Sequence, residues 1–287
     1  VIMSSRILPE FDLLVPQNIP EAVEMLSKYQ DKAAVLAGGT DLLVLMKAGL
    51  KVPYVVSLSE IPGLDYVIYD PVAGLRIGAM ATLAQIVESG SVKEHYPALW
   101  QSAVVNGTPQ TRNKATVVGN ILRASPAGDC CVAALALGGK VVLQGAAGTR
   151  EVDIDHFWVA YRTTARQAFE FAVEYRIPAN VGKSAFKRMT RADQDLSKLN
   201  AAAWLNMSGN VCERARLAIG CVAPTTVRMK QAEEILKGKE ITEGVLKEVE
   251  EAVKSEVTPI DDVRSSAWYR KEVSGILMRR TIQKACA

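Results

Sequence analysis

Two adjacent glycines separate two apolar runs in the segment AAVLAGGTDLLVLMK, residues 33–47. The first run is typical of a short buried strand, and the second of a helix that ends at Gly49. Glycine has no Cβ, so it permits positive φ angles and close approach of a ligand to the main chain. The first N–H groups of a helix lack partners and suit a phosphate. Two interpretations stay open: a strand-to-helix turn with Thr40 as N-cap, or a phosphate-binding turn in which Thr40 adds a donor.

The residues around this turn predict a small parallel α/β unit. FDLLVPQNIPEAVEMLSKY is typical of a strand followed by a helix, with Asn18 as N-cap and Pro20 in the first turn. YVVSL predicts a further strand after the glycine segment. Strands and helices in this alternation favour parallel pairing, here over residues 1–58.

The pattern changes to short alternating strands from residue 59. YVIYDPVAGLRIGA and GGKVVLQGAAGTREVDI predict hairpins, and AFEFAVEYRIP predicts a strand that Pro178 ends. A helix is expected near residues 82–88, and an irregular Gly- and Asn-containing segment over residues 106–129. These elements predict an antiparallel α+β unit over residues 59–178, which completes a two-part domain, residues 1–178.

A C-terminal domain is predicted over residues 179–287. The boundary lies in a short, polar, turn-prone stretch. SAFKRM, AAAWLNM and RARLAIGCVA predict a three-stranded antiparallel sheet, and the chain after Pro224 is mostly helical in pattern. The expected fold class is therefore α+β, with helices on the C-terminal sheet.

Charge and hydropathy exclude some classes of function. The formal net charge is +3, and the basic residues are spread along the chain, which argues against nucleic acid as a partner. The most apolar run, residues 130–143, contains Lys140 and is shorter than the ~20 residues of a membrane span. No signal-peptide pattern opens the sequence, so secretion is not expected.

The cysteines and histidines argue against a metal site. Five cysteines without a CxxC pair are typical of a reducing cytoplasm, and they do not favour zinc or an iron–sulfur cluster in this chain. The two histidines, His95 and His156, are isolated. No paired carboxylates and no nucleophile–base motif stand out, so no catalytic residue is predicted.

A second segment, ATVVGNILRASPAGD (residues 115–129), is also rich in Gly, Asn, Ser and Thr. Thr116, Gly119 and Asn120 offer small donors and close approach, Arg123 suits a phosphate charge, and Asp129 suits a ribose or an adenine amine. A loop stabilised by its own Asn and Ser side chains is the alternative. The dinucleotide fingerprint GxGxxG is absent, so a Rossmann domain gains no support.

Four segments carry a family resemblance: AGGTDLLVLMK, PQTRNKATVVGNILRASPAGD, KSAFKRMTRADQDLSKLNAA and RSSAWYRKEVSGILMRR. In this order, and over nearly the whole chain, they resemble the FAD-binding medium subunit of the xanthine dehydrogenase family of molybdenum hydroxylases, which includes carbon monoxide dehydrogenase. The resemblance implies a non-covalent FAD whose pyrophosphate and ribityl chain the two glycine segments wrap.

The resemblance also implies the site residues. Residues 37–40 match the positions closest to phosphate, Phe171 and Ala172 the positions that pack on the flavin or adenine, and Lys187 a lysine near the isoalloxazine ring. The full set is Val35, Leu36, Ala37, Gly38, Gly39, Thr40, Asp41, Leu42, Thr116, Gly119, Asn120, Leu122, Arg123, Asp129, Phe171, Ala172 and Lys187.

The chain departs from the family pattern at two positions. The family commonly has Thr-Ile/Val-Gly-Gly-Asn, whereas this chain has Val118 at the first glycine. Valine does not adopt positive φ cheaply, so we expect the local main chain or its distance from the cofactor to differ. Asn106 stands nearest to where some relatives stack an aromatic on the flavin.

The implied function is that of an FAD-carrying subunit. It accepts electrons from a [2Fe–2S] subunit and passes them to an external acceptor such as NAD(P)+, while molybdopterin belongs to a third subunit. A hetero-oligomer is implied, a dimer of heterotrimers or larger. A self-contained FAD oxidase or reductase, and an assembly or scaffold subunit without cofactor, stay open as alternatives. Relatives that reduce aromatic thioesters carry an additional iron–sulfur cluster in this subunit, and no cysteine cluster of that spacing exists here.

Overall fold

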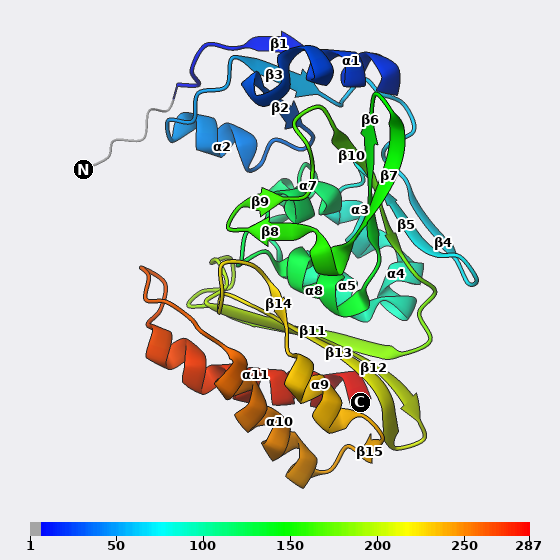
Figure 1. Ribbon diagram of the computed structural model, residues 1–287, viewed down its shortest axis with the longest axis vertical. Helices are drawn as coiled ribbons and strands as arrows, with labels where there is room; N and C mark the ends of the chain where they lie inside the picture. The colour runs from blue at the N-terminus through cyan, green and yellow to red at the C-terminus, as the bar shows by residue number, and fades with distance from the viewer. Residues whose placement is uncertain (1–6) are drawn as a thin grey trace.

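Three sheets of three or more strands follow one another along the chain and along the long axis of the molecule (Figure 1). The computed structural model describes residues 7–287. Residues 1–6, which form part of the predicted unit 1–58, lie outside the described residues. Within the described range, no helix combines the length and the apolar character needed to cross a membrane.

The first unit is the predicted parallel α/β unit. Its three-stranded sheet has the order β1-β3-β2, and both pairs are parallel. The Asn18 side chain caps the first helix by accepting from the Glu21 N–H at 2.9 Å, as its position predicted. The elements of this unit are β1 (Asp12–Leu14), α1 (Ile19–Tyr29), η1 (Gln30–Lys32), β2 (Ala33–Leu36), α2 (Leu42–Lys47) and β3 (Tyr54–Ser57).

The second unit contains the two predicted hairpins. They join in one antiparallel sheet of order β4-β5-β10-β6-β7. Its strands are β4 (Val67–Asp70), β5 (Gly74–Gly78), β6 (Lys140–Gly145), β7 (Gly148–Asp153) and β10 (Phe171–Ile177). A short turn and a small separate hairpin lie between β7 and β10, namely η2 (Ile154–His156), β8 (Trp158–Ala160) and β9 (Thr163–Thr164).

Six helices belong to this second unit, and they correct one expectation. Residues 106–129 are not irregular throughout, because two short helices and the start of a third lie there. Thr108 and Thr116 each cap one of them, accepting from the N–H three residues on. The helices are α3 (Leu83–Glu88), α4 (Gly90–His95), α5 (Pro97–Val105), α6 (Pro109–Arg112), α7 (Val117–Leu122) and α8 (Asp129–Leu137).

Helix α8 explains the most apolar run of the sequence. Every one of its residues is buried, and it packs against α5, α7 and the C-terminal strands β12 and β13. A helix that is apolar all round is buried all round. The apolar run of residues 130–143 continues from α8 into β6. It therefore consists of parts of two core elements and is not one membrane-spanning segment.

The C-terminal unit has five strands rather than the three predicted. The three expected strands lie side by side as β11-β12-β13, and two strands of two residues each add to β13. Such short strands leave no alternation in the sequence. Helices cover the face of this sheet that points away from α8 (Figure 1). The elements are β11 (Lys183–Met189), β12 (Leu199–Ser208), β13 (Val211–Gly220), β14 (Val227–Arg228), α9 (Lys230–Leu236), β15 (Lys239–Glu240), α10 (Glu243–Glu256) and α11 (Ala267–Cys286).

Candidate functional site

A cavity of about 320 Å³ lies where the first unit meets the second. Its volume is within the ~300–1,000 Å³ of small-molecule sites. It is bounded by β2 and the β2–α2 loop on one side and by α7 and the start of β10 on the other. The predicted site residues that line it are Val35, Ala37, Gly38, Gly39, Thr40, Asp41, Leu42, Thr116, Gly119, Asn120, Leu122, Arg123, Phe171 and Ala172. The two segments singled out in the sequence therefore meet.

Gly38 has a different role from the one the sequence suggested. A Cβ built there would lie 1.7 Å from the main-chain oxygen of Lys114 and 3.1 Å from the Cα of Ala115. The missing side chain lets the second segment approach the first, rather than only leaving room for a ligand. Gly39 has φ +73°, a conformation that side chains rarely tolerate. Both glycines are thus required before any ligand binds.

The β2–α2 loop presents donors that have no partner in the chain. Among the described residues, the main-chain N–H groups of residues 38–41 donate to no acceptor. Helix α2 has Asp41 as its N-cap residue, without a side-chain cap, so the Thr40 hydroxyl does not cap the helix. Of the two interpretations of this turn, the donors favour anion binding, because main-chain N–H groups need acceptors.

Val118 does not distort the second segment. It lies in the first turn of α7, is 2 % exposed and packs in the core. Positive φ angles occur elsewhere in the chain but not at this residue. The reason given for that expectation, a positive φ at this residue, does not apply, since Val118 has a helical position that suits valine; a different distance from the cofactor stays a prediction. Asn106 does not line the cavity, and its amide lies 3.9 Å from the Cys130 sulfur.

Two arginines give the cavity its positive charge. The Arg123 Nε donates to Asp41 Oδ1 at 3.1 Å, which joins the two segments. Arg166, which the sequence analysis missed, donates from Nη1 to the carbonyl oxygens of Gln167 and Glu170 at 2.9 and 2.8 Å. Burial lowers the pKa of the Arg166 guanidinium, and nearby carboxylates oppose this. An arginine nevertheless stays protonated at neutral pH.

The other lining residues that the sequence analysis missed are small or apolar. Several flank the matched segments, which was the available signal. They are Ala33, Ala34, Leu45, Leu58, Ala79, Ala115 and Val118. They make most of the wall apolar, as is usual around a bound cofactor.

Three predicted residues do not line the cavity. Leu36 packs in the small core around Met46, behind β2. Lys187 lies in β11, opposite Ala201 of β12. Asp129 begins α8 and is 6 % exposed.

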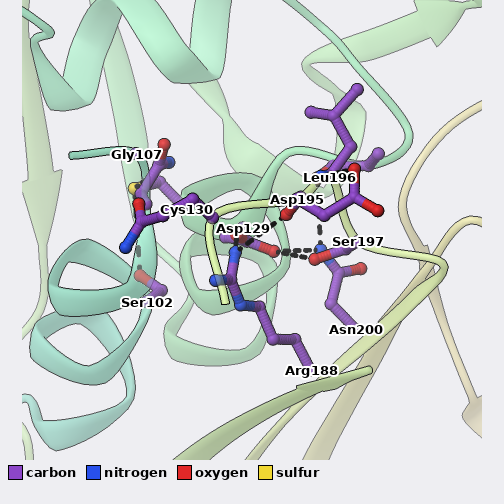
Figure 2. A network of polar contacts seen from close by, with 12 residues as sticks. Ser102, Gly107, Asp129, Cys130, Arg188, Asp195, Leu196, Ser197 and Asn200 are labelled. Carbon is purple, nitrogen blue, oxygen red and sulfur yellow. Dashed lines mark hydrogen bonds and ion pairs between the residues drawn. The ribbon is translucent and has the colours of Figure 1, made fainter. Parts of the chain in front are cut away.

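The Asp129 carboxylate is bound by the C-terminal unit (Figure 2). Its Oδ1 accepts from Ser197 Oγ and Asn200 Nδ2, each at 2.7 Å, and its Oδ2 from Arg188 Nη1 at 3.2 Å. The neighbouring thiol is inert, because burial raises the pKa of Cys130 to about 12. This network therefore joins two units instead of supplying a reactive group.

The residues present fit the diphosphate of an FAD. Gly38 brings the two segments together, residues 38–41 supply unpaired donors, and Arg123 supplies positive charge. Anion sites in proteins are built from such main-chain donors and arginines. The apolar wall suits the uncharged parts of the cofactor.

The comparisons with known proteins cover nearly the whole chain. The family model for the FAD binding domain in molybdopterin dehydrogenase matches residues 9–180, and the model for the CO dehydrogenase flavoprotein C-terminal domain matches residues 184–285. The chain is 30% identical to the carbon monoxide dehydrogenase medium chain of Hydrogenophaga pseudoflava, covering 97% of this chain and 98% of the relative. It is 31% identical to the nicotine 6-hydroxylase medium subunit of Paenarthrobacter nicotinovorans, covering 98% and 99%.

A solved structure agrees with these relatives. The carbon monoxide dehydrogenase from Hydrogenophaga pseudoflava includes a chain that superposes with a TM-score of 0.94 at 29% identity, covering 98% of both chains. The matching fold, the two matching family models and the cavity between the glycine segments agree with one another. The chain therefore belongs to the family of FAD-binding medium subunits of the molybdenum hydroxylases, and it is an oxidoreductase subunit.

Proposed function

We propose that this chain accepts electrons from a [2Fe–2S] subunit and passes them to an external acceptor such as NAD(P)+. The FAD, when bound, supplies the chemistry of taking up electrons singly and releasing them in pairs. The observation that supports this best is the meeting of the two glycine segments at Gly38, with unpaired donors beside it. The chain's own residues bind and orient the cofactor.

The diphosphate is held by residues from both segments. The N–H groups of residues 38–41 and the Thr40 hydroxyl donate to it, and Arg123 offsets its charge. Asp41 orients Arg123 through the 3.1 Å contact at Nε, which leaves both Nη atoms of the guanidinium for the phosphates. Charge-assisted hydrogen bonds of this kind are the stronger ones in proteins.

The cavity offers no group for transferring a proton to or from a substrate. Among its lining residues, the titratable ones are Asp41, Arg123 and Arg166, and each of them has an ion-pair or main-chain partner. A chain that binds FAD without such a group suits electron transfer between partners. It supports placing the substrate chemistry on a molybdopterin subunit.

We propose that the complex also contains an iron–sulfur and a molybdopterin subunit, as a dimer of heterotrimers or a larger assembly. The relatives named above are medium chains or subunits by name. We place the domain boundary at residues 178 and 179, supported by family models that meet between residues 180 and 184. A cytoplasmic location is supported by the five free thiols. Lys187 and Asp129 stay predictions of the sequence as cofactor residues.

The test is to purify the tagged chain from its native host and to examine what accompanies it. Acid should release one FAD per chain, and iron–sulfur and molybdopterin subunits should copurify. The parent substrate should reduce the flavin in the complex but not in the isolated chain. A colourless chain that takes up no added FAD would support a scaffold role. A lone chain that oxidises a small molecule would support an independent oxidase.

Asn120→Ala is expected to weaken FAD binding by roughly 10- to 100-fold, the loss of one hydrogen bond to a charged group. Asn120 lines the cavity, and its Nδ2 has no acceptor among the described residues. Quenching of flavin fluorescence during titration of FAD-free protein measures the affinity. Asn113→Ala is the matched control, because Asn113 lies in the same stretch of chain but not in the cavity wall. An unchanged affinity in the Asn120 variant would contradict the assignment.

A further inference from the structure

Six large apolar side chains are exposed to solvent on three segments of the second and C-terminal units. Their exposed fractions run from 39% for Tyr269 to 96% for Val263. Two of the segments are the β8–β9 hairpin and the loop that follows β11, and the third leads from α10 into the first turn of α11. We call these side chains the outer patch, namely Tyr161, Leu196, Ile260, Val263, Trp268 and Tyr269.

Contacts beneath the outer patch bring the three segments together. The Arg264 Nη1 donates to the carbonyl oxygen of Ser197 at 3.3 Å, in the loop that follows β11. Arg264 also interacts electrostatically with Tyr161 of the hairpin. The Tyr269 hydroxyl lies 3.2 Å from Met189 Sδ, where β11 ends. Figure 1 shows the hairpin and the segment before α11 on the same, left side of the molecule.

The segment before α11 is fixed by ionic contacts on its inner side. Asp262 Oδ1 accepts from the Arg264 N–H at 2.8 Å and from Arg270 Nη2 at 2.6 Å, and its Oδ2 accepts from Arg264 Nη2 at 2.6 Å. Burial acts to raise the pKa of the Asp262 carboxyl, but the hydrogen bonds of the two arginines outweigh burial and hold that pKa well below its usual range. Ile260 and Val263 are therefore presented to solvent in a fixed arrangement. A preorganised surface loses little conformational entropy when it binds a partner.

The exposed area of the outer patch is that of a permanent interface. Side chains of this size bury ~150–250 Å² when fully covered, so the exposed fractions amount to roughly 800 Å² in total. A soluble monomer rarely exposes an apolar patch of more than a few hundred Å². One partner of a stable complex contributes ~800 Å², and a partner that binds and leaves needs less. Tyrosine and tryptophan are enriched at such interfaces and dominate their binding energy.

The outer patch is also joined to the FAD cavity. Ser197, below the patch, donates from Oγ to Asp129 Oδ1 at 2.7 Å (Figure 2). Asp129 begins α8, and Cys131 of the same helix donates from Sγ to the main-chain oxygen of Asn120 at 3.4 Å. Asn120 lines the cavity. Few contacts therefore separate the patch from the cavity, so a protein that binds the patch comes close to the cofactor.

We propose that the outer patch is the docking surface of the [2Fe–2S] subunit. The inference rests on the electron-transfer function proposed above, in which this subunit is the partner that delivers electrons to the flavin. The area of the patch fits a permanent partner, and the contacts below it fit a partner that must stay beside the cavity. An external acceptor comes and goes, and the molybdopterin subunit needs no direct contact with the cofactor. The contacts of Asp262 and Arg264 then fix the position of the docked subunit relative to the cavity.

The experiment uses the complex purified from the native host through a tag on this chain. Val263→Asp and Trp268→Ala should each weaken binding of the iron–sulfur subunit by roughly 10- to 100-fold, and the double variant should purify with FAD but without iron. The measurements are the ratio of iron to FAD in the purified complex and the Kd for the iron–sulfur subunit released from the parent complex. Both side chains are exposed, so each variant should keep one FAD per chain and the unfolding temperature of the parent.

Val72→Asp is the matched control, because Val72 is 87% exposed at the tip of the β4–β5 hairpin, outside the outer patch. It should bind the iron–sulfur subunit like the parent. If the patch variants also bind it like the parent, the docking surface lies elsewhere and the proposal is wrong. Loss of the molybdopterin subunit alone would assign the patch to that subunit, and separation of a dimer of this chain with iron retained would assign it to a second copy. A parent chain that copurifies with no other subunit would instead refute the proposed function itself.

Discussion

Gly38→Ala is expected to lower FAD affinity more than 100-fold and to reduce the free energy of unfolding by about 1–3 kcal/mol. The added Cβ would lie 1.7 Å from the Lys114 oxygen and 2.6 Å from its carbonyl carbon. Both are main-chain atoms, which cannot rotate away as a flexible side chain does. The two glycine segments must separate, and several phosphate donors then lose their geometry at once. Calorimetric titration with FAD and thermal unfolding of FAD-free protein measure the two effects.

Two other glycines provide the controls. Gly39 and Gly63 share a φ of +73°, so alanine should cause similar main-chain strain at both. A Cβ at Gly63 would meet nothing within 4 Å, whereas at Gly39 it would lie 3.1 Å from Leu36 and Leu43 side chains. Only the Gly39 variant should lose FAD affinity. A Gly38→Ala protein that binds FAD like the parent would show that the cofactor does not depend on contact between the segments.

The glycine turn of residues 37–40 shows which features of the site could be predicted from the sequence. Strand, turn and helix followed from local pattern, and the family resemblance correctly brought the two segments together. The reason for Gly38 could not be predicted from the sequence, because its neighbour in space is the main chain at Lys114, which is far away along the chain. The local sequence shows that a glycine is present. Which atoms lie beside that glycine depends on the tertiary structure.

Val118 and Arg166 show the limits of a motif. The family motif marked Val118 as a departure, yet a helical position with a buried side chain accepts valine without strain. Arg166 stands in a turn without periodicity and outside the four segments that carried the resemblance, so nothing local separated it from the other arginines of the chain. It reaches the cavity only because β10 begins beside β2.

Asp129 shows why a polar residue in a motif is ambiguous. A carboxylate that follows a Gly-containing loop suits a ligand and a buried partner equally well, and the sequence does not say which. In the structure, the two carboxylate oxygens of Asp129 accept hydrogen bonds from Ser197, Asn200 and Arg188. These donors come from the C-terminal unit, which begins more than fifty residues later in the chain. The partner set therefore depends on how two units pack.

Removing this carboxylate is expected to cost about 3–5 kcal/mol of the free energy of unfolding, as breaking a buried ion pair does. In the Asp129→Ala protein the Arg188 guanidinium, 10% exposed in its side chain, loses its carboxylate partner and stays largely out of water. Asp195→Asn is the control, because Asp195 pairs with Arg191, whose side chain is 62% exposed, and such surface pairs contribute about 0–1 kcal/mol. Denaturant unfolding of the FAD-free proteins measures both.

The double variant Asp129→Leu, Arg188→Met distinguishes two causes of lost stability. One is the loss of the Asp129–Arg188 ion pair, and the other is the burial of an unpaired charge. With both ionic groups gone, no unpaired charge is buried, so stability should recover most of what Asp129→Ala loses. FAD affinity then decides between the two roles of Asp129. If the carboxylate only joins the units, the double variant should bind FAD nearly like the parent. If Asp129→Ala keeps its stability but loses FAD affinity, the carboxylate contacts the cofactor as the sequence predicted, and its contacts with the C-terminal unit must give way when FAD binds.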